Sequence, residues 1–243
     1  MQRWVMRIVV PMLAAVGLAA ASATWAGHPL STDDAATVTP DHLELELVLD
    51  ALEASENEQG YGVGLTYGLT DTLDIAVATG YAVLHRHPRV RGMRDPELGL
   101  KWRFLDGAER RLSLAVSGGL TFPCDSDLSS GERDWEALLI ASIPARAGVF
   151  HLNLGPTWVG EAGVGQVTVW GLALEMPKPN GTAWYAEIVG DSSGEGCEDD
   201  PLEALVGWSK ESRSGAVYSL GLAVGLSDAS PDWRVSAGFT REF

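Results

Sequence analysis

The sequence has little positive charge. Lys and Arg together number 17, Asp and Glu number 33, and the formal net charge is −16. A protein that binds nucleic acid needs a basic face to neutralise phosphates, so this balance argues against nucleic acid as a partner. Hydrophobic residues make up 46% of the chain and the mean hydropathy is +0.04, so the chain is also too apolar to be disordered.

Cysteine is scarce as well. Cys124 and Cys197 are the only two, which excludes a scaffold held by many disulfides and a zinc site with four cysteines. The sequence also contains no metal-type cluster of Cys and His residues, no P-loop and no dinucleotide-binding glycine string. We therefore expect no metal and no cofactor.

Only one long hydrophobic run is present, and it lies at the N-terminus. Arg3 and Arg7 precede an apolar stretch at residues 8–21, and small residues follow it up to Ala26. This order predicts a secretory signal peptide over residues 1–26, because the apolar stretch is shorter than the ~20 residues of a membrane-spanning helix. An uncleaved anchor helix is the alternative. The exported chain would then be soluble in the periplasm, secreted, or a membrane β-barrel.

The chain is rich in residues that favour strands and turns. Gly numbers 28 and Trp 9, a composition that disfavours long helices. Near the C-terminus, Trp233, Val235 and Phe239 alternate with Arg234 and small residues, a period of two that is typical of a strand. The same pattern predicts twelve strands, near residues 41–50, 60–70, 72–84, 96–105, 111–122, 134–143, 148–158, 166–176, 182–190, 202–210, 216–226 and 232–243.

The connections between these strands alternate in length. Short ones, such as residues 70–72, are followed by longer polar ones, such as 85–95. This alternation indicates an up-and-down antiparallel sheet, and the strand lengths suit the ~9–11 residues that cross a bilayer. We therefore predict an all-β fold, a transmembrane up-and-down antiparallel β-barrel of about 12 strands over residues 41–243. Residues 27–40 are expected to form a short periplasmic N-terminal segment.

The two faces of the predicted strands differ in size as well as polarity. One face carries Leu, Val and aromatic residues, and the other carries mostly Gly, Ala, Ser and Thr. A soluble barrel would instead show Lys and Glu outside, so we expect the apolar face to meet lipid. Aromatic residues near strand ends, such as Tyr61, Tyr81 and Trp135, fit interfacial girdles. A soluble sandwich or lipocalin-like barrel with a Trp-rich core is the alternative.

Charged residues are scattered over the small-residue face. Acidic residues outnumber basic ones there, which favours a preference for cations in an open lumen. The opposing charges could equally pair and fill the lumen. The candidate lumen-lining residues are Glu44, Glu46, Asp74, Lys101, Arg103, Arg111, Glu187 and Arg234.

Three features lie at the predicted barrel ends. Cys124 and Cys197 fall in long loops at one end, and the export compartment permits a disulfide between them; two isolated thiols are the alternative. The loop at residues 85–94 is basic. It could contact anionic lipopolysaccharide or an acidic neighbouring loop, and a loop that contacts only solvent is the alternative. The chain ends in Phe243, which resembles the C-terminal signal read by the bacterial barrel-assembly machinery.

Several stretches resemble one known family. They are GLTYGLTDTLDIAVATGY at residues 64–81, DPELGLKWRF at 95–104, WGLALEMP at 170–177 and GLSDASPDWRVSAGFTREF at 225–243. They are similar to the outer-membrane transporter family described as the MetA-pathway of phenol degradation. The resemblance implies a barrel in the bacterial outer membrane, in contact with its lipid, that passes small compounds, with aromatic compounds as candidates.

The predicted function is that of a channel for the passive passage of small molecules, with hydrophobic or aromatic compounds as the candidate solutes. A non-conducting structural or interaction barrel of the outer membrane is the alternative. We predict no enzymatic activity, because a membrane phospholipase needs a His and a Ser close together on the lipid face. His151 instead shares the lumen side with Asn153, and no Ser lies two positions away from it.

Overall fold

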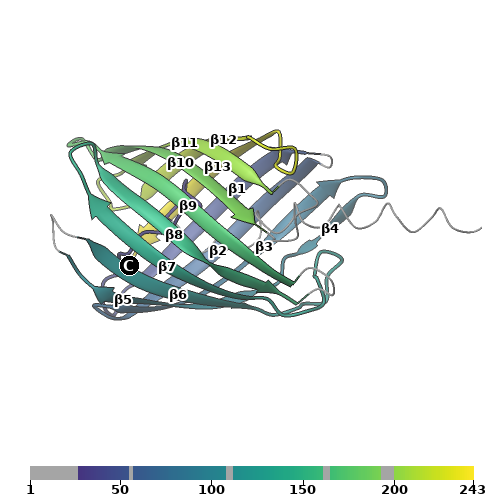
Figure 1. The fold of residues 1–243 in the computed structure, drawn as a ribbon, viewed down its shortest axis with the longest axis horizontal. Helices are drawn as coiled ribbons and strands as arrows, with labels where there is room; N and C mark the ends of the chain where they lie inside the picture. The colour runs from purple at the N-terminus through teal and green to yellow at the C-terminus, as the bar shows by residue number, and fades with distance from the viewer. Residues whose placement is uncertain (1–26, 55–56, 108–111, 161–164, 193–199) are drawn as a thin grey trace, which may run out of the picture.

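The structure is a computed structural model, and its described residues form a closed antiparallel barrel (Figure 1). It describes residues 27–54, 57–107, 112–160, 165–192 and 200–243. The predicted signal peptide therefore lies outside the described residues. Within them, no helix has the length and apolar character needed to cross a membrane.

The barrel wall is a ring of twelve strands, as predicted, and a thirteenth short strand extends it. Each strand of the ring pairs with the next strand of the ring along the chain, β3 with β5 among them, and β1 pairs with β13 to close it, while β4 pairs with β3 alone. The strands are β1 (Leu43–Glu53), β2 (Asn57–Thr70), β3 (Leu73–His85), β4 (Val90–Met93), β5 (Glu97–Leu105), β6 (Ser113–Thr121), β7 (Trp135–Pro144), β8 (Val149–Val159), β9 (Gly165–Pro177), β10 (Thr182–Ser192), β11 (Leu202–Glu211), β12 (Val217–Gly225) and β13 (Trp233–Glu242).

Strand β4 lies within a stretch that the sequence predicts to be a loop. It pairs with the C-terminal part of β3, from Tyr81 to Leu84, whereas β5 pairs with the N-terminal part, from Leu73 to Ala78. The two strands therefore share one edge of β3, and Pro96 lies in the stretch that separates them. Proline lacks the amide hydrogen that a ladder needs, which accounts for the break at this point.

The apolar face of the strands points away from the barrel centre. Leu154 is 56% exposed, Trp184 53% and Val206 60%, while the residues that alternate with them are small or polar and mostly buried. A soluble barrel would have the opposite arrangement, since exposed apolar surface on this scale is unfavourable in water. The outward apolar face confirms the prediction of a transmembrane barrel and argues against a soluble barrel with a Trp-rich core.

The seam between β1 and β13 closes the ring without a free edge. Their register runs from the pair Glu44 and Glu242 to the pair Glu53 and Trp233. At the end of the seam, the amide of Phe243 donates to the Leu43 carbonyl at 2.9 Å, and the Leu43 amide donates back at 3.1 Å. Closure matters in a bilayer, because lipid offers no partner for an unpaired backbone group.

Short hairpin turns gather at the end of the barrel that also holds Phe243. In the β9–β10 turn, the Lys178 amide donates to the Thr182 carbonyl at 2.8 Å, and in the β11–β12 turn the Ser212 amide donates to the Ala216 carbonyl at 2.7 Å. Gly181 has φ 74° in the first turn and Gly215 has φ 79° in the second, a conformation that glycine adopts without strain. The longer connections lie at the opposite end.

Residues 27–40 differ from the expectation of a short periplasmic segment. A β-bridge joins Pro40 to Gly68 on β2, and the residues before it run inside the barrel. The physical reason is the size of the inward side chains, since glycines of the wall leave room for another segment. An added Cβ at Gly171, Gly207 or Gly238 would collide with Thr32, Pro29 or His28, respectively.

Candidate functional site

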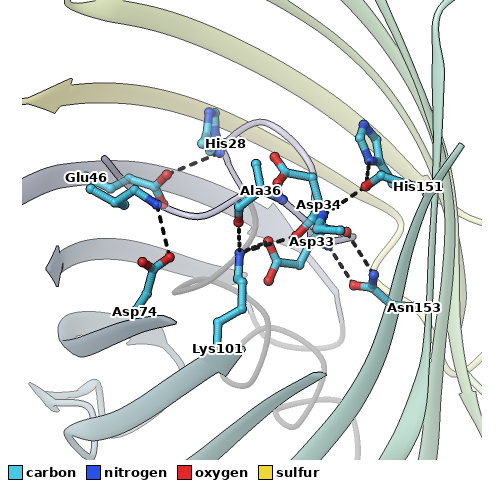
Figure 2. A network of polar contacts seen from close by, with 12 residues as sticks. His28, Asp33, Asp34, Ala36, Glu46, Asp74, Lys101, His151 and Asn153 are labelled. Carbon is cyan, nitrogen blue, oxygen red and sulfur yellow. Dashed lines mark hydrogen bonds and ion pairs between the residues drawn. The ribbon is translucent and has the colours of Figure 1, made fainter. Parts of the chain in front are cut away.

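The candidate site is the barrel interior at the level where residues 27–40 cross it; we call these residues the N-terminal segment. The segment touches strands from opposite sides of the ring, including β3 and β5 on one side and β8 and β10 on the other (Figure 2). Two apolar clusters buried in the barrel include a residue of the segment. Leu30 packs with Ala173, Leu205 and Ala223, and Ala35 packs with Ala115 and Ile140.

A glutamate of the wall binds the backbone of the segment at one place. The Ser31 amide donates to both carboxylate oxygens of Glu187, at 2.9 and 3.1 Å, and the Thr32 amide donates to Oε1 at 2.5 Å. Glu187 lies on β10 and is buried. A buried carboxylate that accepts several amide hydrogens is stabilised by them, so Glu187 fixes two consecutive peptide units.

An asparagine on the same side of the ring binds the next residue through both of its polar atoms. The Asp33 amide donates to Asn153 Oδ1 at 2.6 Å, and Asn153 Nδ2 donates to the Asp33 carbonyl at 2.8 Å. This reciprocal pair imitates the hydrogen bonds between two strands. Because Asn153 is buried on β8, it holds the segment against the wall without an exposed polar atom.

Lys101 on β5 makes the ion pair at the centre of the site. Its Nζ lies 2.8 Å from Asp33 Oδ1 and also donates to the carbonyls of Asp34, at 3.3 Å, and Ala36, at 3.4 Å (Figure 2). The residue is only 6% exposed. A buried ammonium needs such partners, because burial removes its hydration. Lys101 thus holds the bend of the N-terminal segment from Asp33 to Ala36.

The two ends of the segment are held by carboxylates of β1 and β3. The His28 amide donates to Glu46 Oε2 at 3.2 Å, and His28 Nδ1 lies 2.6 Å from Ser219 Oγ. At the other end, the Val38 amide donates to Asp74 Oδ2 at 3.1 Å. Wall carboxylates therefore bind backbone amides along the whole length of the segment.

A serine, a histidine and a glutamate also meet in the interior. Ser142 Oγ accepts the Ala35 amide at 2.9 Å and lies 2.9 Å from His151 Nδ1, and His151 Nε2 lies 3.5 Å from Glu175 Oε2. The Ser142 hydroxyl can both accept the Ala35 amide and share a hydrogen bond with Nδ1, so the three side chains form one connected polar chain. These residue types also occur in hydrolytic triads. Here the serine oxygen accepts the Ala35 amide and His151 is buried, so these three side chains serve to anchor the N-terminal segment.

Arginines of the wall pair with carboxylates farther from the short-turn end. Arg234 donates to Glu203 Oε2 at 3.1 Å and lies 3.5 Å from Ser31 Oγ. Arg94, in the β4–β5 connection, forms an ion pair with Glu58. Each of these ion pairs neutralises one carboxylate of the barrel interior.

Several of the predicted lumen-lining residues meet at the N-terminal segment. Glu46, Asp74, Lys101 and Glu187 bind it directly, and Arg234 lies beside it, as described above. Arg103 instead turns to the short-turn end, where it donates to the Asp71 carbonyl at 2.6 Å and pairs with Asp106 at 3.6 Å. Glu44 is half-buried on β1, and Arg111 lies outside the described residues.

The sequence prediction missed the contacts that complete the site. Asp33 belongs to a segment without strand alternation, so nothing in its local pattern shows that it meets Lys101. The alternation places Asn153 and Glu203 on the inner face, as the sequence predicts, and Ser142 follows the same alternation, but no partner was predicted for any of the three. A polar residue on the inner face between small ones is the signal that identifies them.

The predicted disulfide lies partly outside the described residues. Cys124 belongs to the β6–β7 loop, where its amide donates to Asp95 Oδ1 at 2.8 Å. Burial, together with the neighbouring Asp95 carboxylate, raises the pKa of the Cys124 thiol. Cys197 is not among the described residues, so the pairing stays a prediction. In the part of the chain that the structure covers, no group of three or more His, Cys, Asp or Glu residues is arranged to hold a metal.

Comparison with known proteins gives matches in structure only. No protein-family model and no curated protein sequence matches the chain, so the resemblance to the MetA-pathway family stays a prediction. The COG4313 outer membrane channel from Pseudomonas putida F1 is similar with a TM-score of 0.70 and 13% identity, over 86% of this chain and 98% of that one.

Two further solved barrels are similar. The translocator domain of the autotransporter NalP from Neisseria meningitidis has a TM-score of 0.50 and 13% identity, over 83% of this chain and 88% of that one. The CymD monoaromatic hydrocarbon channel has a TM-score of 0.47 and 10% identity, over 84% of this chain and 89% of that one. At these identities the first two likenesses establish the fold, which is that of a bacterial outer-membrane β-barrel.

Proposed function

We propose that the protein is a channel of the bacterial outer membrane for the passive passage of small molecules, and that the N-terminal segment is a plug that closes it at rest. The observation that carries the proposal is that the N-terminal segment, and not a wall strand, lies inside the barrel. At the level of Lys101 the interior is crossed by residues 27–40, which do not belong to the wall and are held mainly by hydrogen bonds.

The wall makes room for the segment. A barrel that served only as a rigid structure would fill its interior with the side chains of its own strands, as small soluble barrels do. Here Gly171, Gly207 and Gly238 leave space that Thr32, Pro29 and His28 occupy. Displacement of the segment would therefore leave a polar passage lined by small residues, which supports a channel.

The location and partners follow from the same fold. The outward apolar face fits the lipid of the outer membrane, and the C-terminal Phe243 fits recognition by the barrel-assembly machinery. The fold is similar to that of a protein described as an outer membrane channel. The proposal includes no enzymatic step and no cofactor.

The solute class rests on the sequence resemblance, which points to small hydrophobic or aromatic compounds. Uptake into liposomes tests it, with phenol and an aliphatic solute of similar size as the two probes. Faster entry of phenol into liposomes that contain the protein than into empty ones is the expected result. Equal rates for both kinds of liposome would contradict this choice of solute.

Planar-bilayer conductance tests the channel and the plug together. We expect small, infrequent openings for the full chain and a large, steady conductance for a variant that lacks residues 28–36. This deletion removes the contacts to Glu187, Asn153 and Lys101 and keeps every strand. N-terminal sequencing would verify that the variant is processed as the full chain is. Absence of openings in both proteins would contradict the channel.

A non-conducting structural or interaction barrel is the second candidate, and the number of contacts to the segment favours it. Under that function the segment is a permanent part of the interior. The deletion variant separates the two candidates, because a permanent filling would be needed for folding. Loss of heat-modifiable migration on a gel in that variant, together with a silent full chain, would support the second candidate.

A further inference from the structure

The β3–β4 hairpin concentrates positive charge on a strongly acidic protein. We call residues 85–94 the basic hairpin; it contains four of the 17 Lys and Arg residues of a chain with net charge −16. Arg89 and Arg91 are exposed. Arg89 also lies 2.8 Å from His85 Nδ1, which positions its guanidinium at the tip of the hairpin. Figure 1 shows the hairpin at the end of the barrel opposite to Phe243.

The register of the hairpin places Arg91 just beyond a band of aromatic side chains. Met93 pairs with Tyr81, and Arg91 pairs with Val83. Met93 is 46% exposed, and Tyr81 lies beside Tyr61 with ring centroids 6.5 Å apart. Because residues two apart in a strand share a face and lie about 7 Å apart, Arg91 lies one step beyond this outward aromatic band.

This position corresponds to the headgroup layer of the membrane. Tyr residues on the outside of a barrel mark the interface between acyl chains and headgroups. The end of the barrel that carries the longer connections faces the cell exterior in outer-membrane barrels. Arg91 on the outward face is thus at the height of the phosphate groups of the outer leaflet.

The inner side of the hairpin is already occupied. Arg94 turns inward to its ion pair with Glu58, and Ser126 of the β6–β7 loop packs against Gly92. Asp95 at the base of the hairpin accepts hydrogen bonds from Cys124 and Ser129, at 2.8 and 3.0 Å. The β6–β7 loop therefore braces the hairpin from inside and leaves its outward face toward the membrane.

We propose that the outward face of the basic hairpin binds the phosphate groups of the anionic lipid in the outer leaflet. Guanidinium groups bind phosphate through two parallel hydrogen bonds and keep their charge at any physiological pH. The apolar and aromatic band below the hairpin contacts the rest of the lipid, which favours a lipid phosphate over a free anion. This inference concerns the outside of the barrel and does not depend on conduction through its interior.

Binding of bisphosphorylated lipid A to the purified full-length protein in nanodiscs tests the proposal. We expect the double variant R89E/R91E to bind at least about tenfold more weakly than the wild type, because each basic group near an anionic surface adds to the affinity. The variant R89K/R91K keeps both charges and should retain most of the binding. Removal of both phosphates from lipid A should weaken binding to the wild type by a similar factor.

The matched control reverses two exposed charges at the other end of the barrel. Lys178 and Arg213 lie in the β9–β10 and β11–β12 turns, and K178E/R213E should bind lipid A as the wild type does. Heat-modifiable migration would show that each variant is folded. Equal affinity of R89E/R91E and wild type, equal loss in the control, or displacement of lipid A by inorganic phosphate at matched phosphate concentration would overturn the proposal.

Discussion

At the scale of single residues, Lys101 determines whether the N-terminal segment stays against the wall. Its ammonium binds the Asp33 side chain and two carbonyls of the same bend. These contacts are buried, so each partner depends on the other for compensation of its charge. Removal of one partner of a buried ion pair costs about 3–5 kcal/mol, more than a typical single hydrogen bond contributes.

We therefore expect Lys101→Met to release the segment and to raise the bilayer conductance several-fold. Release lets the Asp33 carboxylate reach water, which avoids the cost of a buried unpaired charge. The double variant D33N/K101M removes both charges of the pair, so its conductance should return toward that of the wild type. The control Lys178→Met lies in an exposed turn and should change nothing. A K101M conductance equal to that of the wild type would refute the role of Lys101.

The glycines of the wall give a second test that leaves every charge in place. An alanine Cβ at Gly207 would collide with Pro29 of the segment, whereas at Gly62 the nearest atom is Val48 Cβ at 3.6 Å. We expect Gly207→Ala to increase the open probability in bilayers and Gly62→Ala to leave it unchanged. Similar behaviour of the two variants would argue against displacement of the segment as the opening step.

At the scale of elements, the twelve strands of the ring were predictable because bilayer and lumen impose opposite chemistry on alternate residues. Strand β3 shows this most clearly, since Ile75 and Val77 point outward while Asp74 and Ala76 are buried. Strand β4 was not predictable in the same way. Its four residues lie in a basic stretch, and pairing with β3, rather than burial, determines their conformation.

The N-terminal segment was not predictable from its own sequence. Its polar residues and prolines show no period, so its position is decided entirely by partners far along the chain, such as Glu187 and Asn153. The sequence did place Glu46, Asp74, Lys101 and Glu187 on one face. It could not show that backbone amides, rather than other side chains, would be the partners of the carboxylates.

The last strand carries the prediction at this scale. Phe243 is 57% exposed, and the Arg241 guanidinium lies 4.8 Å from its ring. If the terminal aromatic is read during assembly, Phe243→Ala should reduce the amount of folded protein in the outer membrane several-fold, as measured by heat-modifiable migration. The same variant refolded in detergent should be as stable as the wild type, because the ring packs outside the barrel. A loss of stability in detergent would instead assign Phe243 a structural role.

At the scale of the whole molecule, the charge of the interior depends on whether the N-terminal segment is in place. With the segment bound, the carboxylates of Glu46, Asp74 and Glu187 accept its backbone amides, and Lys101 pairs with Asp33. Removal of residues 28–36 leaves Glu46 and Glu187 without these amides and Lys101 without Asp33, so carboxylates still outnumber the ammonium beside the passage. Fixed charges of one sign attract ions of the opposite sign and raise their local concentration.

The opened channel should therefore prefer cations. For the variant that lacks residues 28–36, the reversal potential in a potassium chloride gradient should have the sign of a potassium-selective pore, and the preference should weaken at high salt because the charges are screened. Glu187→Gln in the same background should reduce the preference, whereas Glu53→Gln, whose carboxylate binds Trp233 at the barrel end, should leave it unchanged. A preference for chloride would show that Lys101 and the arginines outweigh the wall carboxylates.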